Sequence, residues 1–342
     1  MRHLPYAEHL DRPVRPLPAR DARPHGRRRR GALAPILLGG AALAATALYN
    51  AARARQAERR NPPIGRFIEV DGVRLHYVER GSGDPVVLLH GNGTMVEDMM
   101  LSGLVEMLAE DYRVIVFDRP GYGHSERPRD RIWTHWAQAA LLRKAFDRLG
   151  VERPLVLGHS WGSLVALALG LSYESRIRGL VLASGYYYPL PRLDILLFSP
   201  PGFPVVGDVL RYTISPILSR MILPLLFRRL FAPTPVTRRF DRLFPREMTV
   251  RPSQLRAAGA EAAMMLPAAL GFLRRYGELR VPVPILTGGD DFYVGPDRHS
   301  ERLRGALPDS EFVRVPGAGH MVHHVAPEAG ADAIDRLGRR SR

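Results

Sequence analysis

Short runs of apolar residues alternate with helical stretches over most of the chain. Two runs, 67–70 and 73–78, flank Asp71-Gly72, a dipeptide typical of a tight β-hairpin turn. The later runs lack the polar alternation of a half-exposed strand, and helical stretches separate several of them, as in a mainly parallel sheet buried on both faces. We therefore predict an α/β fold with a mainly parallel eight-stranded sheet flanked by helices. The six later runs are centred on 85–89, 113–117, 155–157, 180–182, 285–286 and 312–315, and the helical stretches include 133–149 and 163–171.

The alternation stops between residues 186 and 278, where Pro and Gly interrupt apolar and Arg-rich pieces. A loop without secondary structure is implausible at that length in a compact domain. We therefore predict that 186–278 form an inserted, mostly helical cap. The core of the domain is then built from 64–185 and 279–338.

The N-terminal region has a different pattern. From Gly31 to Asn50, twenty residues carry no charge, which is long enough for an α-helix to cross a hydrocarbon core of about 30 Å. Arg clusters stand on both sides, as they do at membrane boundaries. We predict a transmembrane anchor at 31–50, between a basic, disordered tail at 1–30 and a linker at 51–63. A cleaved signal segment and a buried helix of a soluble protein are the alternatives.

The distribution of arginine gives an orientation to this anchor. Nine Arg precede the uncharged segment and four follow it within ten residues. Because cytoplasmic flanks carry the excess of positive residues, the N-terminus is expected in the cytoplasm and the folded domain outside. If the segment is instead a cleaved signal, the domain would be secreted or periplasmic.

Composition excludes several classes of partner and site. Of the formal net charge of +15, most comes from residues 1–60, which hold 13 Arg and four acidic residues. No zinc, helix-turn-helix or RNA-binding signature accompanies this charge, so we expect no nucleic-acid partner. The absence of cysteine excludes disulfides and thiolate chemistry. We expect no cofactor and no metal, because no phosphate-binding loop is present and His323-His324 lacks companions at ligand spacing.

One pentapeptide predicts a nucleophile. Gly158-His159-Ser160-Trp161-Gly162 follows an apolar run and precedes a helical stretch, which is the strand-turn-helix context of the GxSxG nucleophile elbow. Its glycines relieve crowding in a strained turn that exposes the serine hydroxyl. The start of the following helix also favours negative charge developing near Ser160. A Gly-rich turn with an inert serine is the structural alternative.

A serine nucleophile needs a base, and neutral imidazole is the usual one because its pKa lies near working pH. Among twelve histidines, His320 stands in a Gly-rich loop directly after the predicted strand at 312–315. Loops at the carboxyl ends of parallel strands carry the sites of α/β sheets, which favours His320 as the base. We interpret His323 and His324 as residues on the surface of a helix.

The imidazole in turn needs a carboxylate that fixes its tautomer and supports its positive charge. Asp290 and Asp291 follow the predicted strand around 285–286 and the turn Gly288-Gly289, and either could serve. An acid in this place could also simply cap the following turn.

The oxyanion of a tetrahedral intermediate needs hydrogen-bond donors, and His90-Gly91-Asn92-Gly93 follows the very apolar strand at 85–89. Small residues in this loop let backbone amides approach a substrate oxygen. In the usual elbow arrangement, the donors are the main-chain N–H of Trp161 and one from this loop, which we assign to Asn92. A plain turn after a strand is the alternative.

These motifs resemble the α/β-hydrolase family, in the branch with a helical cap, over residues 64–338. The order Ser, Asp, His is the family's order. Aligning Gly288 with the turn glycine of the family's G-x-x-D pattern selects Asp291 over Asp290. The matching pieces are LLHGNG at 88–93, FDRPGYGHSERP at 117–128, LVLGHSWGS at 155–163, LTGGDDFYVGP at 286–296 and VPGAGHMVHHVAPE at 315–328.

The resemblance implies an acyl-enzyme route in which Ser160 attacks a carbonyl, His320 relays the proton and water releases the acid. Epoxide hydrolases and haloalkane dehalogenases are similar in their cap and in DRPGYGHS, but they carry Asp at the elbow, so Ser160 argues against both reactions. The expected substrate is a carboxylic ester of a hydrophobic molecule. Carbon–carbon bond hydrolysis, amide hydrolysis, acyl transfer, cofactor-free oxygen chemistry and a non-catalytic binding module are the alternatives.

Overall fold

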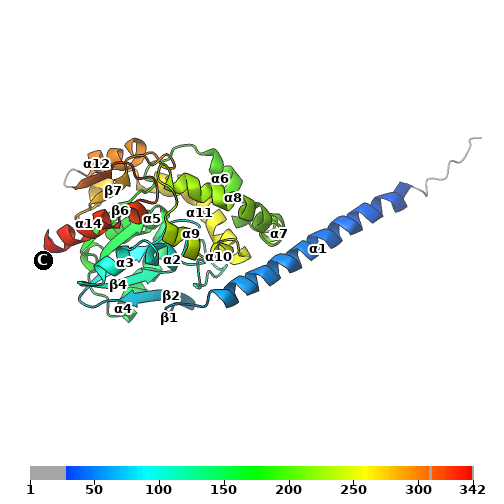
Figure 1. Cartoon of the computed structure of the whole chain (residues 1–342), viewed down its shortest axis with the longest axis horizontal. Helices are drawn as coiled ribbons and strands as arrows, with labels where there is room; N and C mark the ends of the chain where they lie inside the picture. Colours follow the sequence, from blue (N-terminus) through cyan, green and yellow to red (C-terminus); the bar gives the residue numbers. More distant parts are fainter. Residues whose placement is uncertain (1–27, 308–309, 341–342) are drawn as a thin grey trace, which may run out of the picture. The chain divides into compact units, whose positions relative to one another are not determined.

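The computed structural model describes residues 28–307 and 310–340, with only the backbone described at 28–34 and 36. The chain divides into two units, Met1–Leu43 and Ala44–Arg342, and the second contains an eight-stranded sheet (Figure 1). Its strand order is β1-β2-β4-β3-β5-β6-β7-β8. The strands are β1 (Arg66–Val70), β2 (Val73–Arg80), β3 (Asp84–Leu89), β4 (Tyr112–Phe117), β5 (Leu155–His159), β6 (Gly179–Ala183), β7 (Ile285–Gly288) and β8 (Phe312–Val315).

The sheet is antiparallel at one edge and parallel elsewhere. β1 and β2 form the hairpin predicted around Asp71-Gly72, and β2 pairs antiparallel with β4. All later neighbouring pairs are parallel. The central strands β5 and β6 are buried along their whole length, as expected of apolar runs covered on both faces. The predicted mainly parallel sheet of eight strands is therefore confirmed, and each predicted run lies on a strand.

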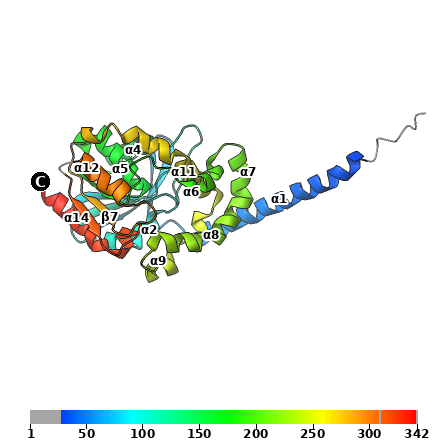
Figure 2. The ribbon, with the colours of Figure 1, turned by 90° about the horizontal axis from the view of Figure 1, so that it is seen from above.

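Helices cover both faces of the sheet (Figure 2). On one face, α4 (His135–Arg148) and α5 (Trp161–Ser172) bury apolar residues against the strands. On the other face, α3 (Leu104–Leu108) and α14 (Pro327–Arg340) build a second buried cluster. Two apolar layers fix the strands, so the loops at their carboxyl ends start from rigid positions. The other elements outside the insertion are α2 (Val96–Met100), η1 (Glu174–Arg176), η4 (Asp297–Glu301), α12 (Arg302–Ala306) and α13 (Val322–Val325).

The residues between β6 and β7, predicted as a cap, are helical in the structure. A cluster of aromatic rings holds α8 against α9, with Phe227, Phe231 and Phe240 buried at its centre. The helix α11 contacts α6 and α7 and carries the insertion back toward the sheet. The elements are α6 (Leu193–Phe198), η2 (Pro200–Gly202), α7 (Val206–Tyr212), α8 (Ile214–Phe231), α9 (Arg238–Leu243), α10 (Arg246–Thr249), α11 (Pro252–Phe272) and η3 (Tyr276–Glu278).

The predicted linker at 51–63 is helical over most of its length, because the helix α1 (Arg28–Arg60) continues through it. Ala, Arg, Gln and Glu are strong helix formers, and they dominate residues 51–60. The helix ends only where Asn61 is followed by Pro62 and Pro63, since the residue before a proline is pushed out of the α conformation.

The last part of α1 belongs to the second unit. The side-chain amide of Asn50 donates to the carbonyl oxygens of Tyr212 (3.0 Å) and Thr213 (2.8 Å), which lie at the junction of α7 and α8. Ala57 is buried in the aromatic cluster, and Glu58 forms an ion pair with Arg251 at 2.8 Å. These contacts attach residues 50–58 to the insertion.

The prediction of a transmembrane anchor at 31–50 is not supported. In the part of the chain that the structure describes, no single helix is both long and apolar enough to cross a membrane. Among the described residues, only α7 and α8 taken together have the length and composition of a membrane span, and the two helices are bent by 60° relative to each other. The side chains at 31–34 and 36, and the tail at 1–27, lie outside the described residues.

Candidate active site

Ser160 lies in the tight turn between β5 and α5, with φ 53° and ψ −117°. A side chain rarely adopts this conformation, which marks a strained backbone. The two glycines of the motif permit it. A Cβ at Gly158 would lie 2.3 Å from the carbonyl oxygen of Gly162, and a Cβ at Gly162 would lie 2.2 Å from that of Leu89. The turn therefore closes only with glycine at both positions.

His320 and Asp291 reach Ser160 from two other strand ends. The loop after β8 places His320 with its Nε2 3.1 Å from the Ser160 Oγ. The loop after β7 places the Asp291 Oδ2 2.8 Å from the His320 Nδ1. When Nδ1–H donates to Asp291, Nε2 accepts from the serine hydroxyl. The structure thus brings the three residues together in one hydrogen-bonded chain, and both His320 and Asp291 are buried.

The two neighbouring acids point in different directions. Burial raises the pKa of Asp291, but the charge and hydrogen bond of His320 and the N–H groups of Tyr293 and Val294 outweigh it and hold that pKa below its ordinary value. Asp291 is therefore ionised at neutral pH. The Asp290 carboxylate instead accepts the exposed backbone N–H of Gly317 at 2.9 Å.

The loop after β3 lies against the nucleophile. A Cβ added at Gly91 would come within 3.1 Å of the Ser160 Cβ. The side chain of Asn92 accepts from the Tyr122 hydroxyl at 2.8 Å and donates to the Ala258 carbonyl at 3.2 Å, which fixes the loop. Trp161 is the first residue of α5, where N–H groups lack an intrahelical acceptor. The loop that holds Asn92 and the first turn of α5 thus both lie next to Ser160, and the assignment of their backbone N–H groups as oxyanion donors stays a prediction.

A buried arginine holds this loop from behind, and sequence reasoning missed its role. Arg119 donates from Nε to the His90 carbonyl and from Nη2 to the Gly91 carbonyl, both at 2.8 Å. Its guanidinium also forms an ion pair with Glu261 of α11 at 2.6 Å, with both side chains fully buried. Burial and Arg119 lower the pKa of His90 to about 4, so that imidazole is neutral and can accept the backbone N–H of Arg119. No local signal links Arg119 to an acid 142 residues away.

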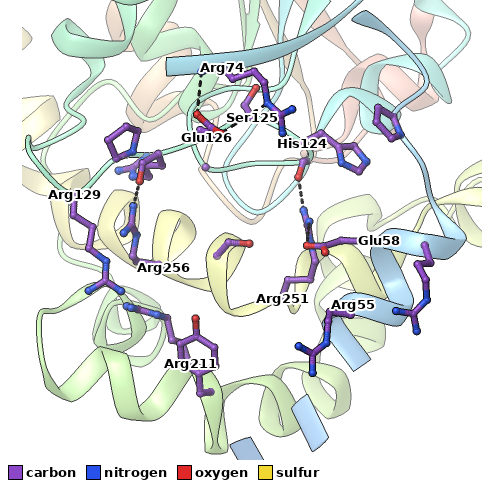
Figure 3. A pocket seen from close by; sticks show the side chains of 18 residues that line it. Arg55, Glu58, Arg74, His124, Ser125, Glu126, Arg129, Arg211, Arg251 and Arg256 are labelled. Carbon is purple, nitrogen blue, oxygen red and sulfur yellow. Dashed lines mark hydrogen bonds and ion pairs between the residues drawn. The ribbon is translucent and has the colours of Figure 1, made fainter. Parts of the chain in front are cut away.

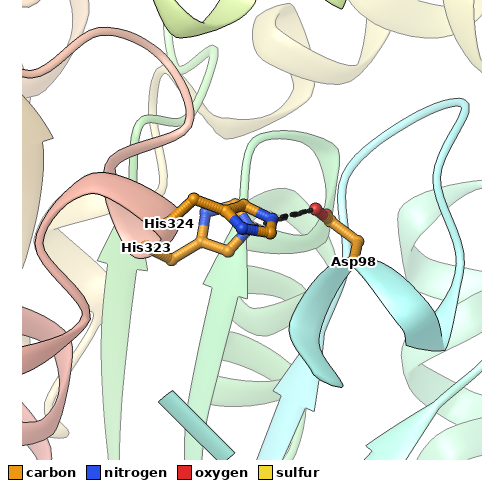
Figure 4. A group of neighbouring side chains, drawn as sticks. All are labelled: Asp98, His323 and His324. Carbon is orange, nitrogen blue, oxygen red and sulfur yellow. Dashed lines mark hydrogen bonds and ion pairs between the residues drawn. The ribbon is translucent and has the colours of Figure 1, made fainter. Parts of the chain in front are cut away.

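The interpretation of His323 and His324 as helix-surface residues is wrong, because α13 packs into the interior. Both rings are buried, and both Nε2 atoms contact the same Asp98 oxygen, at 3.2 and 2.8 Å (Figure 4). Burial raises the pKa of Asp98, but the two histidines outweigh it and hold the pKa well below its ordinary value. Their ligand atoms lie within 4.8 Å of one another, so His323-His324 does have a companion at ligand distance. Asp98 lies 225 residues before His323, so the spacing of residues in the sequence could not indicate this pairing.

An apolar cavity of about 200 Å³ lies next to Ser160, between the sheet and the insertion. The helices α6, α8 and α11 contribute most of its wall, while Asn92, Ser160 and His320 form its polar end. The apolar wall includes Ile195, Leu197, Phe198, Leu218, Ile222, Leu223, Leu226, Leu230, Val250, Leu255, Ala262, Met265 and Met321.

Comparison with known proteins agrees with this architecture. A family model described as alpha/beta hydrolase fold matches residues 84–327. The chain is 27% identical over 290 residues to haloalkane dehalogenase 2 of Mycobacterium tuberculosis, covering 81% of this chain and 96% of that protein. It is 35% identical over 156 residues to the 2-hydroxymuconate semialdehyde hydrolase of Pseudomonas sp. (strain CF600), covering 43% of this chain and 53% of that protein.

Solved structures share the fold. A thermophilic esterase from Thermogutta terrifontis superposes with a TM-score of 0.62 at 24% identity, covering 81% of this chain and 99% of the esterase. The family match spans most of the chain, and the sheet has the eight strands that the sequence predicts. The chain belongs to the α/β-hydrolase fold family.

Proposed function

We propose that the protein is a serine hydrolase that cleaves carboxylic esters of hydrophobic molecules through an acyl-enzyme intermediate. The observation that carries the proposal is the hydrogen-bonded chain from Ser160 through His320 to Asp291. A nucleophile, a base within hydrogen-bond reach and an acid that orients the base are the parts that acyl transfer needs.

Each step has a group in place. Ser160 Oγ attacks the ester carbonyl carbon while His320 Nε2 takes its proton, and the backbone N–H groups of Asn92 and Trp161 donate to the oxyanion. The ester C–O bond then breaks, and His320 returns the proton to the departing alcohol. Water attacks the acyl-enzyme with His320 as base again, which frees the carboxylic acid and restores Ser160. Asp291 stays ionised and supports the positive charge that His320 carries in both steps.

The cavity supports a hydrophobic acyl group, because most of the side chains that the cap helices contribute to its wall are apolar, with Asp194, Ser215, Ser219 and Thr249 as polar exceptions. Dehalogenation, the activity named for the Mycobacterium tuberculosis relative, is not proposed. Displacement of a halide in that class of enzyme uses an Asp at the elbow, whereas this chain has Ser160.

A fluorophosphonate probe tests this proposal, since it labels a serine only when a base activates it. We expect labelling of the wild-type protein and hydrolysis of p-nitrophenyl butyrate. Ser160→Ala and His320→Ala should abolish both, while Ser172→Ala, a change at an exposed serine at the other end of α5, serves as the matched serine control. An unlabelled, inactive wild-type protein would favour a non-catalytic binding module.

Carbon–carbon bond hydrolysis on the same triad is the second candidate. It is favoured by the 35% identity to a 2-hydroxymuconate semialdehyde hydrolase and by the 28% identity to a 2-hydroxy-6-oxononadienedioate/2-hydroxy-6-oxononatrienedioate hydrolase of Paraburkholderia phymatum. Parallel assays with p-nitrophenyl esters and with a 2-hydroxy-6-oxo-dienoate separate the two. A higher kcat/KM for the dienoate would assign the protein to the second class.

A further inference from the structure

The insertion carries an exposed apolar surface on its outer side. We call it the apolar cap face. It spans α6, η2, α7 and α8 as far as Leu225, and these elements lie side by side in both views (Figures 1 and 2). Soluble monomers rarely expose a contiguous apolar patch larger than a few hundred Å², so a face of this kind points to an interaction site. Its most exposed members are Leu193, Leu196, Val205, Val206, Met221 and Leu225.

The helix α8 shows why this face is unusual. Ile222 and Leu226 line the cavity, whereas Met221 (72% exposed) and Leu225 (69% exposed) lie on the open side. A helix at a protein surface normally has one apolar stripe that faces the core, whereas α8 has apolar side chains on a second side as well. One side of α8 is therefore covered by the protein, and the other side needs an apolar environment that the second unit does not supply.

The apolar cap face is continuous with the cavity. Leu197 and Leu218 line the cavity, yet they are 58% and 46% exposed. They form an apolar path from the surface to the space beside Ser160. A protein partner bound to this face would cover that path, whereas hydrophobic molecules could enter the path directly from a lipid surface.

A groove lined by arginine begins where the apolar cap face ends on α7 (Figure 3). It has a volume of about 840 Å³, and its lining contains eight arginines and two glutamates. We call it the arginine groove. It lies between the last turns of α1, the end of α7 and the start of α11. Tyr212 lines the groove and is also exposed beside Val209 of the apolar face.

Five of the eight arginines form ion pairs with acidic side chains, whereas Arg55, Arg59 and Arg256 form none within the described residues. Within the described residues, Arg256 has no acidic side chain in ion-pair distance, and one of its nitrogens contacts the Arg127 carbonyl. Partial burial, together with Arg127, Arg129 and Arg211, lowers the pKa of Arg256 to about 10. The groove therefore keeps an excess of positive charge, and phosphate is an anion whose geometry a guanidinium group matches.

We propose that the apolar cap face and the arginine groove together dock the protein on an anionic lipid surface, with the ester substrate entering the cavity from the lipid. The entry of an ester substrate rests on the proposed esterase function, whereas the docking itself is argued only from the apolar cap face and the arginine groove. Lipid phosphates would pair with the groove while the apolar face meets the acyl region. A second copy of this chain is a poorer occupant, because its arginines would face the same positive groove.

The chain contains no cysteine, so a single introduced cysteine can carry an environment-sensitive nitrobenzoxadiazole label on the full-length protein. We place it at Leu196→Cys or Met221→Cys, which do not line the cavity. The matched control is Met107→Cys, an exposed methionine on α3. On vesicles of phosphatidylglycerol and phosphatidylcholine, the two cap labels should shift to the blue and be quenched by brominated lipid, and the control should not.

No response at either cap position would overturn the proposal. So would a response that grows with protein concentration in the absence of lipid, because it would assign the face to a second copy. For the groove, Arg55→Gln with Arg256→Gln should weaken binding to anionic vesicles by about tenfold or more. Inorganic phosphate binding that this double variant removes, without any preference for anionic vesicles, would assign the groove to a free anion and overturn docking.

Activity separates this proposal from the catalytic one. Leu196→Glu with Met221→Glu should reduce hydrolysis of a long-chain ester in anionic vesicles by about tenfold or more. The same variant should hydrolyse soluble p-nitrophenyl butyrate like the wild type. A wild-type protein that inserts but cleaves neither ester would overturn the catalytic proposal alone. One that cleaves the soluble ester but never inserts would overturn docking alone.

Discussion

Asp290 and Asp291 differ only in where the turn after β7 aims their side chains. Asp291 contacts His320 at 2.8 Å, whereas Asp290 accepts an exposed backbone N–H. The N–H groups of Tyr293 and Val294 fix the Asp291 carboxylate from the other side. Orientation of the imidazole therefore depends on one acid of the pair.

We expect Asp291→Asn to lower kcat for p-nitrophenyl butyrate by a factor on the order of 10³–10⁴, because the amide favours the wrong imidazole tautomer. Asp290→Asn is the matched control and should retain kcat within about threefold, since its loss affects only an exposed hydrogen bond. Steady-state kinetics of both variants, with circular dichroism to check folding, measures this. Equal losses in the two variants would contradict the assignment.

His135 shows how burial alone makes stability depend on pH. Its ring packs against those of Trp136 and Phe272, and its Nε2 has no hydrogen-bond partner among the described residues. Burial lowers its pKa to about 4, although the charge of Glu261 opposes the shift. The unfolded chain, with a histidine pKa of about 6.5, binds the proton earlier, so folding stability falls as the pH drops from about 6.5 to 4.

His135→Phe keeps a flat ring in this place and removes the titrating group. Between pH 7 and 4.5, we expect the variant to lose about 2 kcal/mol less of its free energy of unfolding than the wild type. Urea unfolding at a series of pH values measures the difference. His90 and His299 have pKa values lowered to about 4 by the same cause, so some dependence on pH should remain. A variant with the wild-type slope would contradict the argument.

At the scale of elements, Arg119 and Glu261 connect the loop after β3 to α11 of the insertion. The same guanidinium that pairs with Glu261 donates to the carbonyls of His90 and Gly91. The Tyr122 hydroxyl, 2.7 Å from Glu261 and 2.8 Å from the Asn92 side chain, forms a second connection. The position of the insertion is therefore coupled to the backbone proposed to bind the oxyanion.

Glu261→Gln should lower the free energy of unfolding by about 3–5 kcal/mol, because it leaves the Arg119 charge buried without a counterion. Arg119→Met with Glu261→Leu should recover much of this loss, since apolar residues of similar size need no partner. The double variant still lacks the donors to His90 and Gly91, so kcat should stay reduced by about tenfold while KM changes less. Urea unfolding and kinetics on the soluble ester measure both. A double variant with wild-type kcat would limit the pair to a structural role.

Most elements could be predicted from local patterns in the sequence. Each strand is a short apolar run bounded by turn residues, and the GxSxG turn is identified from the few residues on either side of it. The paired groups that complete the site are different. Glu261 and Arg119 are 142 residues apart, and Asp98 is 225 residues from His323. Only the packed fold brings such pairs together, so no spacing in the sequence could indicate them.

At the scale of the whole molecule, local patterns predicted the role of the N-terminal helix least well. Its uncharged segment resembled an anchor and its Arg-rich end resembled a linker, yet α1 runs through both. Helix propensity predicts the helix but not its partners, which lie more than 150 residues away at Tyr212, Thr213 and Arg251. Exposure of the apolar cap face was equally hidden, because exposed and buried leucines look alike in a sequence.

The contacts of α1 predict where the chain can be shortened. Residues 44–342 form one compact unit that contains the whole sheet, so a protein starting at residue 44 should keep the melting temperature and the p-nitrophenyl butyrate activity of the full chain. Removal of residues 1–60 deletes the Asn50 hydrogen bonds, the burial of Ala57 and the pairing of Arg251 with Glu58. At about 1 kcal/mol for each, the loss is about 3 kcal/mol, or roughly 5–10 °C in Tm. Asn50→Ala in the full chain should account for about a third of it, which calorimetry can resolve. If both truncations melt like the full chain, residues 44–60 act as a linker after all, and the junction of α7 and α8 is held by the insertion alone.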